Sequence, residues 1–457
     1  SNQANNADIL FKGTDDSSAI TALTLDMSEA GAATFGGKIL AGLGATAAAT
    51  INAYTTTVST NLFSALRIIE NSGASSYWDI GSTGGGSPDL KFFSNANTTP
   101  KLTLSTAGAL TATTYNGIPF YSNGTSFYTH DVSATENSAS ANTAFGSGAM
   151  DAITTGDSNS AVGVNALGIL TTGSRNVAIG HAAGDNLVSG TDNVAVGYGA
   201  LSTEDGHGKN VAIGAYTLVN QNAGADAYNV AVGYNSGNAV TTGTLNTLIG
   251  GLAGDALTEG NHNTVLGYGA LSNETLGDRN VAVGSNALYA QNNTSNVDAY
   301  NVAVGYNAGA AVTTGTLNTI IGGLAGDALT TGVRNVAIGY EALSAEDTGG
   351  NTVAIGYEAL KVQDAGANTF NVAIGYQTGK AVTTGLNNTL VGAKAGDALT
   401  TGSRNVAIGL SALSLEDAHG RNVAVGYNAL TTLNAGADAY NTAIGYDAGA
   451  DVTTGVQ

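Results

Sequence analysis

Residues 176–180 read Asn-Val-Ala-Ile-Gly, and close variants of this pentapeptide bring the number of copies to eighteen in a chain of 457 residues. Successive closing glycines lie 17 residues apart, except that the steps after Gly214, Gly284, Gly356 and Gly426 measure 19, 21, 19 and 19 residues. A short, fixed period predicts a stacked array in which each repeat contacts mainly its neighbours. At roughly 4.8 Å per repeat, the array would extend on the order of 85 Å. The closing glycines, called anchor glycines below, are Gly146, Gly163, Gly180, Gly197, Gly214, Gly233, Gly250, Gly267, Gly284, Gly305, Gly322, Gly339, Gly356, Gly375, Gly392, Gly409, Gly426 and Gly445.

The pentapeptide predicts a short strand that is apolar on both faces. Alternation places Val177 and Ile179 on one face and Ala178 on the other. A half-solvated strand would carry a polar residue at 178, so we expect one face to line a solenoid core and the other to meet a partner. The position of Ala178 is occupied by Ala in fourteen copies, and each exception follows a Thr, which indicates that bulk is traded between two packed faces. The exceptions are Leu248, Val265, Ile320 and Leu390.

The residues around the strand predict how each repeat closes. An Asn stands four residues before the anchor glycine in seventeen copies, with Thr352 as the one departure. Stacking would place these amides above one another as a ladder; a simple preference for Asn in turns is the alternative. The segment 340–343 and the glycine of Thr-Thr-Gly, as at Gly332, predict a compact half-turn that ends in a left-handed glycine. A single helical turn in the Ala-Leu segment is the other possibility.

A longer period overlies the 17-residue period. Four steps add up to 70 or 72 residues, and the residue four after the anchor alternates in pairs of Gly and Leu, as at Gly237 and Gly254, then Leu271 and Leu288. This pattern indicates duplication of a four-repeat block. The longer step in each block predicts a surface bulge, for example at 292–294. One aspartate marks the same repeat of every block, at Asp185, Asp255, Asp327 and Asp397.

Composition excludes several classes of function. The formal net charge is −20 with only 14 Lys and Arg, so a basic phosphate-binding stripe is absent and we expect no nucleic-acid partner. The chain has no Cys, which removes disulfides and thiolate metal sites. The most apolar stretch, 39–58, is diluted by Gly, Asn and Thr, whereas a spanning helix needs about 20 mainly apolar residues. We therefore expect no membrane insertion.

Candidate chemical groups are sparse, and we predict no catalytic, cofactor-binding or metal residues, no cofactor and no enzymatic activity. The histidines are too scattered to suggest a site. Recurring Glu-Asp pairs could suggest the paired carboxylates of glycoside hydrolysis, but one active site needs no periodic copies. With Lys209 and Arg421 close by, we expect solvated salt bridges instead. The histidines are His130, His181, His207, His262 and His419, and the pairs are Glu204-Asp205, Glu346-Asp347 and Glu416-Asp417.

Three further patterns have structural interpretations. The Gly-Asp at Asp255 departs from the nine-residue calcium-binding repeat, so we expect it to cap a turn or a helical start. Adjacent threonines in Thr-Thr-Gly would point to opposite sides, which argues against an ice-binding array. Nine tyrosines directly follow an anchor glycine; they could stack on glycans, but we expect packing between repeats. They are Tyr198, Tyr234, Tyr268, Tyr306, Tyr340, Tyr357, Tyr376, Tyr427 and Tyr446.

The repeated motif resembles that of a known group of proteins. Asn-Val-Ala-Ile-Gly followed by Tyr-x-Ala and a glycine turn is similar to the head repeats of trimeric autotransporter adhesins, which form left-handed parallel β-rolls in homotrimers. The longer form, which adds Ala-Leu and Thr-Thr-Gly, resembles repeats in tail-fibre proteins of marine and cyanobacterial phages. The resemblance covers residues 142–457. It implies an all-β chain whose long parallel β-solenoid of 17-residue repeats belongs to a homotrimeric fibre.

The residues before the repeats are consistent with the same resemblance. We expect a β-rich shaft or attachment segment at 1–65, a small β domain at 66–109, a connector at 110–141 and the solenoid of four-repeat blocks at 142–457. Residues 23–25 and 102–104 repeat in outline, and 66–69, 77–81 and 90–93 resemble small modules that precede the shaft of phage fibres.

The resemblance implies a structural, non-enzymatic fibre of a phage tail that attaches to a host surface. Its expected partners are two further copies of the chain, the baseplate or other tail proteins, and a glycan or protein of the host. Its expected location is the virion tail fibre, outside the cell. A trimeric adhesin on a bacterial surface is the alternative, and a tailspike-like depolymerase would need a carboxylate cluster. The receptor-binding residues are unknown. Because the last repeat ends at Gln457 without a polar cap, we also expect the natural protein to continue beyond it, with receptor contact there.

Overall fold

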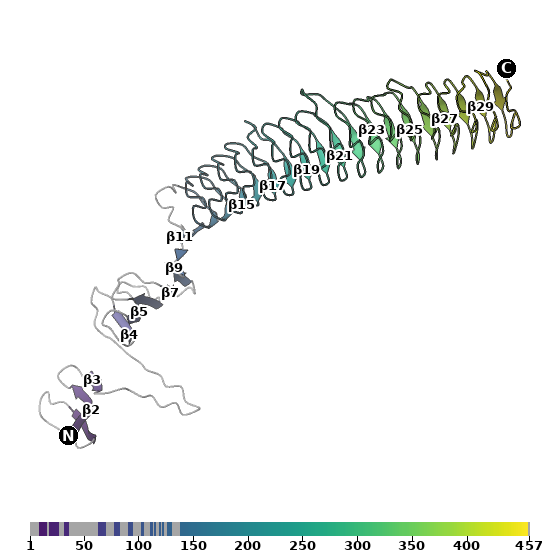
Figure 1. Ribbon diagram of the computed structural model, residues 1–457. Helices are drawn as coiled ribbons and strands as arrows, with labels where there is room; N and C mark the ends of the chain where they lie inside the picture. Colours follow the sequence, from purple (N-terminus) through teal and green to yellow (C-terminus); the bar gives the residue numbers. More distant parts are fainter. Residues whose placement is uncertain are drawn as a thin grey trace. The chain divides into compact units, whose positions relative to one another are not determined.

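The computed structural model describes residues 126–129 and 138–455 with their side chains, and the backbone of eleven short strands between residues 9 and 122 (Figure 1). The chain divides into two compact units, Ser1–Ala112 and Thr113–Gln457.

The first unit contains two antiparallel sheets. One has the strand order β1-β2-β3, and the other is a meander, β4-β5-β6-β7-β8. The expected boundaries at residues 65, 109 and 141 stay predictions. The strands are β1 (Ile9–Asp15), β2 (Ser18–Asp26), β3 (Ala32–Phe35), β4 (Phe63–Ile69), β5 (Tyr77–Ser82), β6 (Leu90–Ser94), β7 (Leu102–Leu104) and β8 (Leu110–Ala112).

The second unit is a parallel β-solenoid that begins after two short hairpins. β9 (Thr114–Tyr115) pairs with β10 (Ile118–Pro119), and β11 (Tyr121–Ser122) pairs with β12 (Phe127–Tyr128), which starts the parallel stack. The eighteen strands that follow are β13 (Thr143–Phe145), β14 (Ser160–Val162), β15 (Val177–Ile179), β16 (Val194–Val196), β17 (Val211–Ile213), β18 (Val230–Val232), β19 (Thr247–Ile249), β20 (Thr264–Leu266), β21 (Val281–Val283), β22 (Val302–Val304), β23 (Thr319–Ile321), β24 (Val336–Ile338), β25 (Val353–Ile355), β26 (Val372–Ile374), β27 (Thr389–Val391), β28 (Val406–Ile408), β29 (Val423–Val425) and β30 (Thr442–Ile444).

Each repeat forms one turn of the solenoid and contributes one three-residue strand. Every strand pairs in parallel with the strand of the next turn without any shift, so that Val177, Ala178 and Ile179 face Val194, Ala195 and Val196. Hydrogen bonds between turns continue outside the strands, for example from Thr171 N to Val188 O at 2.8 Å. The described residues contain no helix, so the Ala-Leu segments are turns and not helical turns. The prediction of an all-β parallel solenoid with 17-residue repeats is confirmed.

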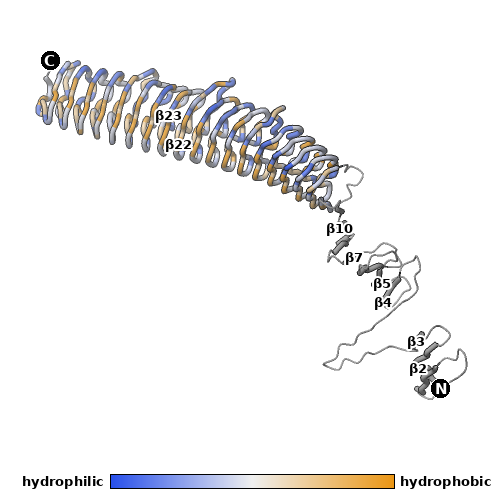
Figure 2. Tube along the Cα trace, turned by 180° about the vertical axis from the view of Figure 1, so that it is seen from behind, coloured by the Kyte–Doolittle hydropathy of each residue, from blue (hydrophilic) through white to orange (hydrophobic). Residues whose placement is uncertain are grey.

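The core combines a row of mostly small strand residues with larger aliphatic residues such as Leu187 and Leu257. The middle residue of each strand from β13 to β29 is at most 2% exposed, whereas the flanking Val and Ile point outward and are half-buried or exposed. Hydrophobic and hydrophilic residues therefore recur in rows along the solenoid (Figure 2). The Ala178 face belongs to the chain's own core, and nothing in the described chain covers the Val and Ile face. Within the single chain, the expectation that both faces are buried is therefore confirmed only for the Ala178 face.

The exchange of bulk between repeats takes place inside the core. Leu248 is buried, and its Cδ1 and Cδ2 lie 2.7 and 3.0 Å from where a Cβ would stand on Gly237 and Gly254. Ile320 and Leu390 lie in the same way against Gly309 and Gly379. The large strand residues therefore fill the space left by the paired glycines. The interpretation that bulk moves between the two faces of the strand is wrong, because both partners of the exchange lie in the core.

The asparagines form the predicted ladder. The backbone N–H of Asn176 donates to Oδ1 of Asn159 at 2.9 Å, and Nδ2 of Asn176 donates to Gly190 O in the next turn at 2.8 Å. The side chain of Asn176 is 1% exposed. A buried amide costs free energy unless it is hydrogen-bonded, and the repeat satisfies this requirement by passing each bond to the next turn. Thr352 keeps the backbone bond to Asn335 Oδ1, at 3.1 Å.

Glycine has two different roles in the turn. The anchor Gly180 has φ of +134°, and a Cβ on it would lie 2.4 Å from Gly197 O. The Thr-Thr-Gly glycine at Gly332 is not left-handed, contrary to the prediction, but a Cβ there would lie 2.5 Å from Gly349 O. Gly332 is therefore required by the close approach of the next turn and not by its backbone conformation. The left-handed conformation is found two residues later, at Arg334, with φ of 56°. Its N–H donates to Thr316 O of the preceding turn, which offsets the strain.

Candidate functional site

A column of the core carries glutamates where most turns have an aliphatic residue. Glu204, Glu274, Glu346 and Glu416 stand seven residues after their anchor glycines and are 0% exposed. The equivalent residues of neighbouring turns include Leu187 and Leu257. Burial raises the pKa of Glu204 and of Glu346, because the low-dielectric core disfavours the charged carboxylate. One such glutamate occurs in each block, which indicates that it has the same structural role in every block.

Three of the four glutamates, Glu274, Glu346 and Glu416, bond to the longer step of the following turn. Oε1 of Glu274 accepts N–H bonds from Gly277 and Asn293 at 2.8 and 3.1 Å, and Oε2 accepts from Gln291 Nε2 at 2.8 Å. In the last block, Oε2 of Glu416 accepts from Ala435 N at 3.1 Å. Asn293 and Ala435 both lie in 21- or 19-residue steps. The predicted surface bulge at 292–294 is therefore partly wrong: Asn292 and Thr294 are exposed, but Asn293 is buried against the glutamate.

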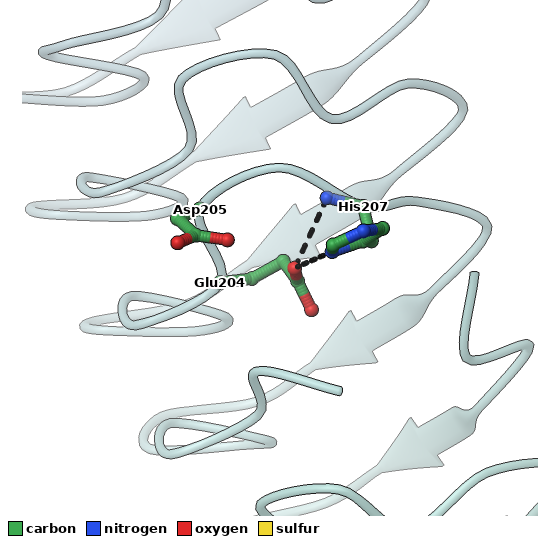
Figure 3. Close-up of side chains that lie close together, drawn as sticks. All are labelled: Glu204, Asp205 and His207. Carbon is green, nitrogen blue, oxygen red and sulfur yellow. Dashed lines mark hydrogen bonds and ion pairs between the residues drawn. The ribbon is translucent and has the colours of Figure 1, made fainter. Parts of the chain in front are cut away.

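Two histidines lie beside these glutamates. Figure 3 shows the Glu204 carboxylate turned toward His207, with Asp205 on its other side. Oε1 of Glu204 lies 3.1 Å from the backbone N and 3.7 Å from Nδ1 of His207. His419 repeats the arrangement, with 3.4 Å between its Nδ1 and Oε1 of Glu416. The sequence reasoning treated the histidines as scattered and missed this recurrence, which appears as Glu-x-x-His in equivalent repeats. His181 stacks on Tyr198 instead, and His130 lies outside the described residues.

Three groups in the described turns place three possible metal ligands within 4.8 Å of one another: Glu204, Asp205 and His207; Glu416, Asp417 and His419; and Glu346, Asp347 and Asp364. The glutamate carboxylate of each group is already a hydrogen-bond acceptor for its own turn. Glu346, for example, accepts from Gly349 N at 2.7 Å and from Gln363 Nε2 at 3.0 Å. Glu204 and Gln221 are the equivalents of Glu346 and Gln363 in an earlier block. There the corresponding bond is not made, because Glu204 Oε2 and Gln221 Nε2 both lack a partner. Turn anchoring therefore accounts for the glutamates of the Glu346 and Glu416 groups, whereas Oε2 of Glu204 has no hydrogen-bond partner.

The expected pairing of the Glu-Asp motifs with Lys209 and Arg421 is wrong. Lys209 Nζ lies 2.6 Å from Asp226, and Arg421 lies 3.0 Å from Asp438, in each case 17 residues further along the chain. Each cation also lies 5.0 Å from a tyrosine ring centre, on Tyr228 and Tyr440 respectively. Because stacking brings residues one turn apart together, the next turn supplies the partner, and the nearby glutamate points into the core.

Five of the nine tyrosines after the anchor glycines stack on one another at the surface. Tyr340 and Tyr357 stack at 5.6 Å between centres, Tyr357 and Tyr376 at 5.3 Å, and Tyr427 and Tyr446 at 5.0 Å. The predicted packing between repeats is confirmed for these rings. All nine tyrosines are nevertheless exposed, which leaves ring faces and edges open to a ligand.

The aspartate that marks each block does not begin a helix. Asp255 follows Gly254 in a turn, and its Oδ1 is buried without a hydrogen-bond partner, as in Asp327 and Asp397. Burial raises the pKa of all three side chains. Of the two predicted roles of Asp255, the cap of a helical start is wrong because the described turns contain no helix, and the cap of a turn stays a prediction.

The outward face of the strands carries an apolar side chain in every described turn. The residue directly before the anchor glycine is Ile, Val, Leu or Phe in all eighteen turns, and we call this set the outer row. Its members include Ile179 at 44% exposure and Ile374 at 38%. The one-to-one register of the strands aligns these side chains along the solenoid. The outer row is therefore a candidate binding surface.

Comparison with protein-family models, with curated proteins and with solved structures finds no match for this chain. Within the part of the chain that the structure describes, no helix has the length and hydropathy needed to span a bilayer.

Proposed function

We propose that this chain is the shaft of a homotrimeric phage tail fibre that reaches and attaches to a host surface. In this proposal it is structural and non-enzymatic, lies outside the cell as part of the virion, and joins the baseplate or other tail proteins. The resemblance of the Asn-Val-Ala-Ile-Gly-Tyr-x-Ala repeats to tail-fibre repeats supports the phage setting. The outer row is the observation on which the proposed assembly of several chains rests.

The outer row argues for a protein partner because soluble monomers rarely expose long contiguous apolar surfaces. Its side chains recur once per turn from Phe145 to Ile444. A partner that covers such a row must repeat with the same spacing along its own length. A second copy of this chain has that spacing, including the longer steps at matching heights. Further copies of the chain are therefore the partners that fit the row best.

The solenoid also suits a spacer. Each turn bonds to the next through backbone and asparagine hydrogen bonds, so length grows by duplication without a new fold. The four-turn blocks are the trace of such growth. A fibre of this kind carries its attachment surface away from the particle.

The test combines mass with location. The intact chain is measured by light scattering, where a trimer gives three times the chain mass of 45.1 kDa. Antibodies against the solenoid are then used in electron microscopy of phage particles and of bacterial cells. Label on tail fibres supports the proposal. Label on the cell surface in place of particles would support the bacterial adhesin, and a stable monomer would refute the trimer.

A further inference from the structure

A surface cavity of about 550 Å³ lies on the turns that carry β19 to β22. It is bordered by two tyrosines, Tyr268 and Tyr289, which are 61% and 45% exposed. Between them lies Gly269, where a Cβ would stand 3.0 Å from Asn286 Oδ1 and 3.8 Å from the Tyr289 ring. The missing side chain at Gly269 therefore helps to open the cavity. Its volume is within the range of small-molecule sites.

In the next block of the same chain, charged residues occupy the positions that line the cavity. Glu341 replaces Gly269, Glu358 replaces Asn286 and Lys361 replaces Tyr289. Lys361 pairs with Glu341 and, at 2.9 Å, with Glu358, which also pairs with Lys380 at 2.6 Å. The equivalent surface is thus occupied by a network of charges. The next block therefore does not repeat the lining of the cavity, so this lining is not shared by all blocks.

The lining of the cavity indicates its ligand chemistry. Asn273, Asn286 and Asn307 line the cavity with amide groups, of which Asn286 Nδ2 donates to Asn307 Oδ1 at 3.2 Å. Asp255 adds a carboxylate whose Oδ1 is buried below the cavity surface without a partner. The same oxygen also lacks a partner in Asp327 and Asp397. The unpartnered oxygen alone therefore does not distinguish the cavity; the residues around Asp255 do. The lining contains no Lys, Arg or His, which disfavours an anion. Phenol rings beside neutral amides match a ligand with apolar ring faces and many hydroxyl groups.

We propose that this cavity binds a neutral saccharide, with one sugar ring against Tyr268 or Tyr289 and hydroxyl groups on the asparagines and Asp255. Aromatic side chains supply large, rigid contact area. Amides that fix orientation by hydrogen bonding supply the specificity. The site lies on the shaft, so the inference goes beyond the proposed fibre role and does not depend on the number of chains in the fibre.

The experiment uses the intact chain in its native assembly on a microarray of oligosaccharides. The array carries neutral hexose and N-acetylhexosamine chains beside sialylated and amine-bearing ones, and the strongest neutral binder is titrated by calorimetry. The test variant combines Gly269→Glu with Tyr289→Lys, which installs the pair found at Glu341 and Lys361. The chain tolerates this pair in the next block, where φ of Glu341 is 52° against 61° at Gly269. Tyr357→Ala, in the stacked rings outside the cavity, is the matched control.

We expect wild type to bind a neutral oligosaccharide, the double variant to lose at least tenfold in affinity, and Tyr357→Ala to retain the affinity. Circular dichroism checks the fold of the double variant, and Tyr289→Ala replaces it if it does not fold. Absence of neutral binders, binding of only sialylated or amine-bearing chains, or full affinity in a folded cavity variant would each overturn the inference. Light scattering on the same samples reports assembly independently, so a failed sugar site is distinguishable from a failed fibre.

Discussion

At the scale of single residues, the core depends on the division of volume between the strand and the turn that follows it. Leu248 occupies space next to Gly254, whereas Ala337 stands in a turn with Leu343 four residues after its anchor. Both arrangements fill an interior in which alanine stands beside larger aliphatic residues. Close-packed interiors penalise both voids and overpacking, so each pair is expected to act as a unit.

This coupling leads to a double-mutant prediction. Leu248→Ala should destabilise the solenoid by about 2–5 kcal/mol, because it leaves a cavity. Gly254→Leu alone should also destabilise, since its Cβ would lie 3.0 Å from Leu248 Cδ2. The two changes together reproduce the Ala337 and Leu343 arrangement and should recover most of the loss. Chemical unfolding followed by circular dichroism measures all three, and strictly additive losses would contradict the coupling.

Sequence reasoning identified the right residues here but the wrong geometry. The alternation of Gly and Leu and the exceptions at Leu248 and Ile320 are visible in the sequence, yet a three-residue strand does not reveal that both partners lie in the core. The same limit applies to Gly332. A glycine in a turn suggests positive φ, but the actual requirement is contact with the carbonyl of Gly349 in the next turn. That contact is between turns, and no local pattern encodes it.

At the scale of elements, three of the buried glutamates, Glu274, Glu346 and Glu416, connect one turn to the longer step of the next. The sequence signal is a Glu in a column of Leu and Val, one turn before each longer step. It was overlooked because Glu204, Glu346 and Glu416 are followed by Asp, which suggested a solvated charged pair. Burial becomes evident only when the column is aligned through the structure.

Glu346 should make stability depend on pH. Burial raises its folded pKa above the ordinary value of 4.5, so the folded state retains a proton that the unfolded chain has already lost. The stabilisation is fully present below about pH 4.5 and is lost as the pH rises through the folded pKa. Relative to Glu346→Leu, which cannot titrate, wild type should therefore lose stability as the pH rises from 4.5 through the folded pKa. Thermal unfolding of both proteins across this range measures the difference.

Glu358 is the matched control because its shift has the opposite sign. Hydrogen bonds from Lys380, Gln377 and Lys361 lower its pKa to about 2. Its stabilisation is present above pH 4.5 and is lost as the pH falls toward 2. Glu358→Gln should therefore differ from wild type most at neutral pH and least in acid. Parallel curves for wild type and Glu346→Leu would contradict the buried-charge account.

At the scale of the whole molecule, the outer row predicts which substitutions prevent assembly. Ile374→Lys places a charge in the row, where burial against another copy would cost several kcal/mol of desolvation. We expect a clear shift from trimer toward monomer in light scattering. Leu415→Lys changes a residue that is equally large and 53% exposed but lies outside the strands. It should leave the mass unchanged, and equal effects of the two variants would argue against the row as the interface.

The architecture of the second unit could be predicted from sequence because one short motif is repeated many times. Each copy of Asn-Val-Ala-Ile-Gly carries little information, but eighteen copies at nearly constant spacing permit few folds other than a stack. The cavity beside Tyr268 could not be predicted in the same way. It arises from Gly269 and Tyr289 in different turns, and its distinctness becomes clear only beside the ion pairs of Lys361.

The direction of the ladder bonds has a mechanical consequence. The N–H and C=O groups that join one turn to the next point along the stack, so a pull on the end of the chain opens the bonds of one turn before it loads those of the next. A single molecule held by its ends should lengthen in a sawtooth of nearly equal steps. Each step releases a turn of 17 residues, or roughly 55–60 Å of extended chain. The turns of 19 and 21 residues should give slightly longer extension steps, one in every four. A force–extension trace from optical tweezers would therefore show the four-turn blocks in order.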